Sequence, residues 1–404
     1  MPMEDRENLG VRKAKHKEVR VSIVNWLSER LPLEFLNQFS REQLAEPQPG
    51  HVSWLHTLGF TALFLFIFQI ATGILLLFYY KPSATEAYAS VKFIIEKTNY
   101  GWFIRQMHAW GANFIVTVLA LHLLRVFFYG AYKKPRELTW MAGALLFLIT
   151  LGFGFTGYLL PWDQLAFWGT TVGSDSTKEV PLIGGLLLKL LRGGELVSDI
   201  TLSRFFALHV AILPLALFAL LGLHLFLIRY HHISPLTRAG ETEPSPEQVM
   251  ANGGKPYFPD HFKKELLVSY AVLIGLVVMA ISVHMPLGKP ANPMVTPPHI
   301  KPDWYFLPVY QLLKYVPGWL GVLGVGAFAG ALVLLPLLDR TPERHPRRRK
   351  VMITVGVIVI VATVGLGWLG HISDSTWRIF GTRVYFDLQA IPHVLKEGEQ
   401  PGSR

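Results

Sequence analysis

The sequence contains no cysteine among its 404 residues. That absence excludes disulfide bonds, thiolate metal sites and any cofactor attached through a thioether. Charged residues are also scarce, at 16% of the chain, whereas soluble domains usually carry about 25%. The polar N-terminus, MPMEDRENLGVRKAKHKEVR, has no apolar core, so no cleaved signal peptide is expected.

The shortage of charge is concentrated in long apolar stretches. Each is long enough to cross a hydrocarbon core about 30 Å thick at about 1.5 Å of helical rise per residue. Because backbone groups in lipid must be satisfied internally, we expect these stretches to be helices. Seven spans are predicted, at 57–80, 108–129, 139–160, 205–229, 266–286, 317–338 and 351–370. The expected fold class is therefore an all-α polytopic membrane protein.

Basic residues indicate how the spans are oriented. The net charge of +10 could suggest binding to nucleic acid, but the basic residues lie between apolar spans. We therefore expect the chain to lie in a lipid bilayer and not to bind nucleic acid. The N-terminal 20 residues and the loop 339–350 each carry six basic residues, and the loop 130–138 carries three. With seven spans, these segments share one side. The positive-inside rule then predicts a cytoplasmic N-terminus. The long loops 161–203 and 287–316 fall on the outer side.

These features divide the chain into five predicted parts. A short amphipathic helix on the cytoplasmic surface is indicated by Ile23, Val24, Leu27 and Leu31. The parts are a cytoplasmic N-terminal segment (1–50), a four-helix transmembrane domain (51–230), a cytoplasmic linker (231–265), a three-helix transmembrane domain (266–370) and an outer tail (371–404).

Four of the 15 histidines lie within predicted spans at matched spacing. His108 and His122 are 14 residues apart on the second span, and His209 and His224 are 15 apart on the fourth. Fourteen residues correspond to about 3.9 turns and about 21 Å of rise, so the two imidazoles of the second span face a similar direction. The 15-residue spacing of the fourth span repeats this arrangement with an offset of about 60° of rotation. The two spans are parallel. His108 therefore pairs with His209 near the outer side, and His122 pairs with His224 near the inner side. Each pair could ligate one haem iron axially, giving two stacked b-type haems.

A simpler alternative is that these histidines bond neighbouring helices or line a proton path. Two pairs at matched spacing on parallel spans favour the haems. Glycines share the period: Gly59 and Gly73 on the first span, and Gly143 and Gly157 on the third, are 14 apart. Alone each could be a close helix contact, but together they would leave room for macrocycles at the same two depths.

Two arginines lie beside the second-span histidines. Arg105 is one turn before His108, and Arg125 is three residues after His122. Their guanidinium groups could pair with haem propionates. Snorkelling toward the membrane interface is the alternative for both.

Several long segments match one family. They are RQMHAWGAN with HLLRV, KKPRELTW, TGYLLPWDQLAFWG, SRFFALH with LGLHLFLIR, and PDWYFLPVYQLLK. Over residues 22–370 the chain resembles cytochrome b of the bc-type quinol:cytochrome c reductases. Some details look closest to the oxygenic-photosynthesis branch, in which the two halves are separate polypeptides: the 15-residue spacing and the three-span C-terminal half. That branch tethers an extra haem to a cysteine at the position of Thr57, so a covalent third haem is not expected here.

The resemblance implies a quinol-oxidising site under the two long outer loops. The matching residues are Pro302, Asp303, Trp304 and Tyr305, where the family usually has Glu in place of Asp303. Asp303 would accept a quinol proton, and the pocket would be shaped by Tyr305, Tyr310 and Phe167. The alternative for Asp303 is a helix cap after the proline-rich loop.

The resemblance also implies a Q cycle that builds a proton gradient. Its partners would be a Rieske iron–sulfur protein, a membrane-anchored c-type cytochrome and quinone, in a homodimeric complex. The fused, seven-span form and the absence of cysteine suggest a bacterial plasma membrane. His231 and His232 could supply protons at an inner quinone site, although both could equally be interfacial. Two rival functions are a dihaem anchor of a formate dehydrogenase or hydrogenase, which lacks the PDWY segment, and a transporter without haem. An optical spectrum separates the transporter from the haem proteins.

Overall fold

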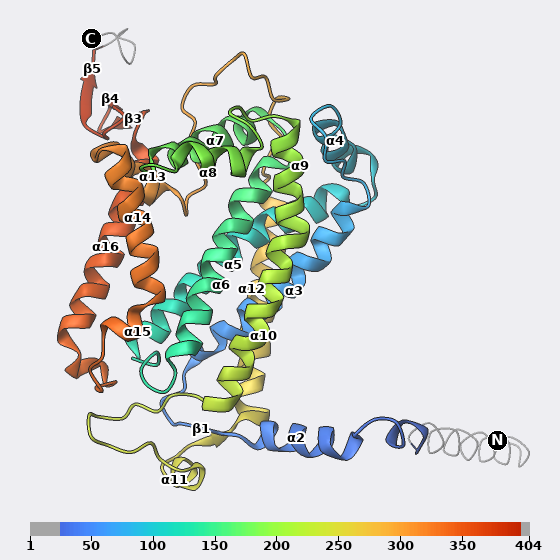
Figure 1. Cartoon of the computed structure of the whole chain (residues 1–404), viewed down its shortest axis with the longest axis vertical. Coiled ribbons are helices and arrows are strands. Elements are labelled where there is room, and N and C mark those ends of the chain that lie inside the picture. Colours follow the sequence, from blue (N-terminus) through green and yellow to red (C-terminus); the bar gives the residue numbers. More distant parts are fainter. Residues whose placement is uncertain (1–24, 397–404) are drawn as a thin grey trace, which may run out of the picture. The chain divides into compact units, whose positions relative to one another are not determined.

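The computed structural model describes residues 25–396, which are mostly helical (Figure 1). The helices are α2 Leu33–Ala45, α3 Leu58–Leu77, α4 Ala87–Lys97, α5 Gly101–Phe128, α6 Glu137–Leu159, α7 Gln164–Asp175, α8 Gly184–Arg192, α9 Asp199–Ala207, α10 Leu213–His231, α11 Pro246–Ala251, α12 Phe262–Ser282, α13 Leu307–Tyr315, α14 Gly318–Val333, α15 Leu335–Leu338 and α16 Lys350–Ile372. The strands are β1 Pro47–Gln48, β2 Lys255–Pro256, β3 Ser375–Ile379, β4 Thr382–Phe386 and β5 Pro392–Leu395.

Six of the predicted spans are helices long and apolar enough to cross a membrane, within residues 25–396. The remaining prediction, 317–338, is not one continuous helix, because α14 ends at Val333 and a short α15 follows. Pro336 explains the break, since it has no N–H to donate to the carbonyl of Leu332 four residues earlier. The indole Nε1 of Trp140 on α6 donates to that carbonyl instead, at 2.7 Å.

Four helical segments form the central bundle. Helix α3 packs against α5, and α10 packs against α6, while α5 and α6 are also in contact. A buried apolar core fills the space between them, with residues from all four helices: Leu58, Ala62, Leu65, Phe66, Ile115, Val116, Val118, Leu119, Leu146 and Leu217. Outward-facing positions such as Ile67 and Ile74 stay exposed and apolar, as a lipid-facing surface requires.

The two long loops pack together at one end of the bundle, which we call the outer end after the predicted orientation. Asp163 and Pro290 form an isolated β-bridge, and Gln164 N donates to Lys289 O at 2.9 Å. The Asp163 side chain caps α7 at the N–H of Ala166 and also accepts the N–H of Gly288. Figure 1 shows α7, α8 and α13 lying across this end.

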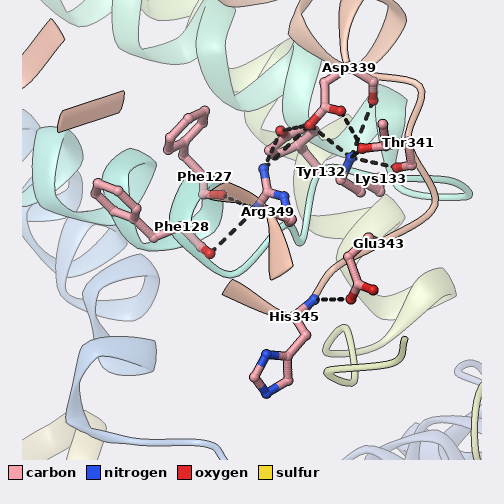
Figure 2. Close-up of polar contacts among 9 residues, drawn as sticks. All are labelled: Phe127, Phe128, Tyr132, Lys133, Asp339, Thr341, Glu343, His345 and Arg349. Atoms are coloured by element: carbon pink, nitrogen blue, oxygen red, sulfur yellow. Dashed lines mark hydrogen bonds and ion pairs between the residues drawn. The ribbon is translucent and has the colours of Figure 1, made fainter. Parts of the chain in front are cut away.

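The opposite, inner end is held together by buried charges (Figure 2). The Asp339 cluster consists of Tyr132, Lys133, Asp339 and Arg349, whose side chains are buried. Lys133 Nζ is 2.8 Å from Asp339 Oδ2, and Arg349 Nη2 is 3.4 Å from the same oxygen. The Tyr132 hydroxyl also donates to Asp339. The cluster therefore joins the loop after α5 to the segment between α15 and α16.

Arg349 also caps the C-terminal end of α5, the helix that bears His108 and His122. Its Nη1 donates to the carbonyls of Phe127 and Phe128, the last two residues of α5, at 2.9 and 3.3 Å. A cation at a helix C-terminus is favourable because the last carbonyls have no partner within the helix. Residue Arg349 thus stabilises the inner end of α5.

The described chain divides into two compact units. One contains 25–52 with Pro244–Leu266, and the other contains Ser53–Glu243 with 267–396. In the first unit, β1 pairs with β2 in antiparallel register, Pro47 opposite Pro256. Of the residues that predicted a surface helix, Ile23 and Val24 lie outside the described residues. Leu31 is exposed and lies just before α2.

Candidate functional site

The four candidate ligands come from two helical segments of the bundle. His108 and His122 lie on α5, and His224 lies on α10. His209 lies in a π-helical turn, Leu208–Ile212, between α9 and α10. The ring centroids of His108 and His209 are 6.4 Å apart, with the planes at 73°. Metal–imidazole bonds are about 2 Å long. Two imidazoles that bind one iron from opposite sides through Nε2 therefore have ring centroids separated by a distance close to the one observed. The outer pair, His108 and His209, therefore fits bis-imidazole ligation.

The π-turn accounts for the unequal spacing of the two histidine pairs. A π-turn holds one residue more than an α-helical turn, so it absorbs the fifteenth residue between His209 and His224. Pro214, two residues after the end of this turn, has no N–H to donate to the carbonyl of Val210, which favours a wider turn at this point. His209 can therefore share a direction with His224 despite the extra residue.

Three of the four imidazoles are fixed through Nδ1. Thr72 Oγ1 lies 2.9 Å from Nδ1 of His108, and Thr156 Oγ1 lies 3.2 Å from Nδ1 of His209. The carbonyl oxygen of Thr139 lies 2.9 Å from Nδ1 of His224. An Nδ1–H donated to such acceptors leaves the Nε2 lone pair for a metal.

Each of the four periodic glycines lies against one imidazole. A Cβ built on Gly157 would be 2.6 Å from Cε1 of His209, and one on Gly143 would be 2.9 Å from Cε1 of His224. The corresponding distances are 3.1 Å from Gly59 to His122 and 3.3 Å from Gly73 to His108. The glycines on α3 thus face the α5 histidines, and those on α6 face His209 and His224.

The two arginines differ in their contacts. Arg105 Nη1 donates to the carbonyl of Met285 at 2.7 Å, so part of the hydrogen-bonding capacity of this guanidinium is already used by a loop carbonyl. The Nε of Arg125 is buried and has no hydrogen-bond partner among the described residues. Nδ1 of His122, one turn away, is in the same condition. An anionic propionate would satisfy Arg125, so this end of the bundle also fits a haem. Thr57, in place of the tethering cysteine, is buried and donates to Trp54 O at 2.7 Å.

The predicted outer site gathers around Asp303. The hydroxyl of Tyr305 donates to Asp303 Oδ2 at 2.9 Å. Burial raises the pKa of the Asp303 carboxyl above its ordinary value. Phe306 is the N-cap of α13, so the alternative that Asp303 caps this helix is wrong. Tyr305 also touches α6, because a Cβ on Gly154 would be 2.7 Å from its hydroxyl.

The other residues predicted for the outer site surround this pair to different degrees. Trp304 Nε1 donates to Asn113 Oδ1 on α5 at 2.7 Å, which links the segment after Pro302 to the helix of His108. Phe167 is buried in a cluster that includes Phe155, and Phe155 contacts Phe306 edge-on at 6.3 Å. The Tyr310 hydroxyl donates to Ile300 O at 3.3 Å, and its ring lies under the Lys314 ammonium. Among the described residues, the hydroxyl of Tyr310 makes its hydrogen bond to Ile300 and not to Asp303.

His231 and His232 end α10 at the inner end of the bundle. Arg136 donates to both of their carbonyl oxygens, at 2.6 and 3.2 Å, and forms an ion pair with Glu243 at 2.7 Å. The Arg136 and Arg344 guanidinium groups hold the pKa of the Glu243 carboxyl at about 2 despite its partial burial. The two histidines are thus held through their backbone.

Sequence reasoning missed Thr72 and Thr156, the hydroxyl partners of the outer pair. A signal was present, because each directly precedes a periodic glycine, as Thr72-Gly73 and Thr156-Gly157. It also missed the Asp339 cluster. That cluster joins residues over 200 positions apart, so spacing along the chain carries no sign of it.

Comparisons with known proteins identify the family to which the chain belongs. The family described as Cytochrome b/b6/petB matches residues 43–232, and the family described as Cytochrome b(C-terminal)/b6/petD matches residues 290–386. The chain is 37% identical over 352 residues to "Cytochrome bc complex cytochrome b subunit" of Chlorobaculum thiosulfatiphilum, covering 84% of this chain and 79% of that protein.

Two further matches extend the comparison. The chain is 35% identical over 356 residues to "Cytochrome b/c1" of Bradyrhizobium diazoefficiens, which covers 86% of this chain but spans only 50% of that longer relative. A solved chain of "Hyperthermophilic respiratory Complex III" superposes with a TM-score of 0.77 and 33% identity, covering 86% of this chain and 91% of that one.

Proposed function

This chain belongs to the cytochrome b family, and we propose that it is the cytochrome b subunit of a quinol:cytochrome c oxidoreductase. It is a multi-pass membrane protein that binds b-type haem and works within a bc-type complex. The observation that carries the proposal is the outer pair, whose 6.4 Å separation suits one axially ligated iron. A transporter that uses intramembrane histidines does not require this arrangement.

We propose two haems per chain, each held by two histidines. His108 and His209 would hold the outer iron, and His122 and His224 the inner one. Haem supplies reversible one-electron transfer at each position. The chain's own contribution is to fix the imidazole rings and to keep the site apolar. Gly59, Gly73, Gly143 and Gly157 allow close approach of the rings, and Arg125 offers a buried cation to an inner propionate.

Quinol oxidation would take place at the outer end, beside Asp303. A carboxyl whose pKa is raised by burial can accept a proton from a quinol hydroxyl and later lose it to the outer solution. The Tyr305 hydroxyl, 2.9 Å away, orients that carboxyl. Pro302, Trp304 and Phe167 would shape the pocket, and Tyr310 would fix the loop that leads into it. An inner quinone site near His231 and His232 completes the proposal.

The remaining assignments rest on the same resemblance. We propose a Rieske iron–sulfur protein, a membrane-anchored c-type cytochrome and a second copy of the complex as partners, with quinone as the substrate at both ends. We also propose a bacterial plasma membrane with a cytoplasmic N-terminus, which the positively charged loops support. The relatives reported above are named cytochrome b, and the likeness to the oxygenic-photosynthesis branch stays a prediction from the 15-residue spacing.

Haem content of two variants tests the proposal. His209→Leu removes one outer ligand, whereas His393→Leu changes an exposed histidine of β5. The purified complex should keep only the inner haem in the first variant and both haems in the second. Two haems per chain in His209→Leu would contradict the ligand assignment.

A further inference from the structure

Two threonine hydroxyls make the same contact with the two outer histidines. Thr72 on α3 faces His108, and Thr156 on α6 faces His209, each through Oγ1 and the ring Nδ1. Each threonine directly precedes the glycine that touches the same imidazole. The same kind of hydroxyl contact therefore fixes each outer imidazole, from α3 for His108 and from α6 for His209.

The direction of these hydrogen bonds follows from the threonines' other contacts. The Thr72 hydroxyl donates its proton to the carbonyl of Phe68 at 2.9 Å. The Thr156 hydroxyl donates to the carbonyl of Gly152 at 2.8 Å. A hydroxyl has one proton, so with that proton committed to its own helix it can only accept from the imidazole. Both outer histidines must then carry their proton on Nδ1 and present the Nε2 lone pair inward.

Backbone groups of Gln69 and Phe153 also interact with His108 and His209, but within residues 25–396 the inner histidines lack the threonine hydroxyl contact. Nδ1 of His224 faces a backbone carbonyl, that of Thr139, and Nδ1 of His122 has no partner among the described residues. The residues that precede the inner glycines are Leu58 and Ala142, which have no hydroxyl. The hydroxyl contact is thus confined to the outer pair in the described structure.

We propose that Thr72 and Thr156 are positioning residues that lower the reduction potential of the outer haem, each by accepting the Nδ1 proton of one outer imidazole. An accepted Nδ1–H makes the imidazole a stronger donor to iron, and a stronger donor favours the ferric over the ferrous state. The inference rests on the proposed outer haem and adds to it the groups that tune that haem.

Valine tests the hydroxyl because it keeps the shape of threonine. Thr72→Val and Thr156→Val should each raise the midpoint potential of the outer haem, identified as the component lost in His209→Leu, and leave the inner one unchanged. A tenfold change in the ratio of ferric to ferrous binding corresponds to about 59 mV for a one-electron couple, and we expect a shift up to that size.

Thr150→Val is the matched control. Thr150 is buried on α6 and donates to the carbonyl of Leu146 at 2.8 Å, as Thr156 does to its own helix, but no hydrogen bond joins it to a histidine among the described residues. Its replacement should leave both potentials at the wild-type values. A shift of the outer potential in Thr150→Val equal to that in Thr156→Val would overturn the proposal.

Serine variants keep the test valid if the valine variants lose the outer haem. Thr72→Ser and Thr156→Ser keep the hydroxyl, so the outer haem should stay bound at its wild-type potential. Loss of the haem, or a valine-sized shift, in the serine variants overturns the inference, as do unchanged potentials in the valine variants. These results can be distinguished from a failure of the proposed function itself. In that case the wild-type complex would not show two titrating haems.

Discussion

Replacing Gly157 by alanine should disturb the outer haem more than any of the other three glycine replacements. The new Cβ would be 2.6 Å from Cε1 of His209, whereas carbon atoms in contact are normally about 3.5–4.0 Å apart. One of the two groups must therefore move by about 1 Å. The ring has little freedom to do so, because Thr156 bonds its Nδ1 and Phe153 packs edge-on at 5.4 Å.

The size of the effect can be estimated from overpacking in protein cores, which typically costs about 1–3 kcal/mol. The affected side chain is a proposed haem ligand, so we expect weaker haem binding rather than global unfolding. Gly73→Ala acts on the same haem from the opposite side, where the clearance to His108 is 3.3 Å. It should therefore be much milder.

The assay is haem per chain and the reduced-minus-oxidised spectrum of the purified complex. Gly222→Ala on α10 is the control, because nothing lies within 4 Å of its Cβ position. It should keep both haems and stabilise the helix by about 0.5–1 kcal/mol. Full haem content and unchanged outer-haem spectra in Gly157→Ala would refute the close-contact reasoning.

Three further predictions concern the two ends of the bundle. Asp303→Asn removes the proposed proton acceptor, so quinol oxidation should fall by about 10²–10⁴-fold with both haems retained; wild-type turnover would rule out that role. Tyr305→Phe removes the hydroxyl that orients Asp303 and should slow the same reaction less, with an altered pH profile. Asp339→Asn leaves two buried cations uncompensated and should cost about 3–5 kcal/mol, seen as a lower temperature for loss of haem absorbance; an unchanged temperature would contradict it. Burial alone would raise the pKa of the Asp339 carboxyl, but the Lys133 ammonium and the hydroxyls of Thr341 and Tyr132 lower it from its ordinary value of 3.8 to about 2. The contribution of Asp339 to wild-type stability should therefore be lost as pH falls between these two values, and Asp339→Asn should lack this loss.

Much of the helical architecture could be predicted from the sequence, because lipid leaves so few options to the backbone. Long uncharged stretches give helices, and the period of histidine and glycine places them at matching depths. The break between α14 and α15 was missed, although Pro336 is visible in the sequence. Its effect depends on Trp140, which supplies a donor to the carbonyl that Pro336 leaves unsatisfied.

Other features depended on contacts between distant segments. The 15-residue spacing indicated an offset of the two histidines on one helix, and the π-turn at Leu208–Ile212 absorbs that offset. The Asp303–Tyr305 hydrogen bond is local and lies within a recognised motif, whereas the Asp339 cluster joins loops that follow different spans. Burial of its charges is set by tertiary packing, which local patterns do not encode.

A spectroelectrochemical titration of the wild-type complex, combined with a haem-to-chain ratio, tests the central claim most directly. Two b-type haems per chain are predicted, titrating as two one-electron components with spectra of six-coordinate bis-imidazole iron. One haem per chain, or no haem, would contradict the stack of two histidine pairs on α5 and α10.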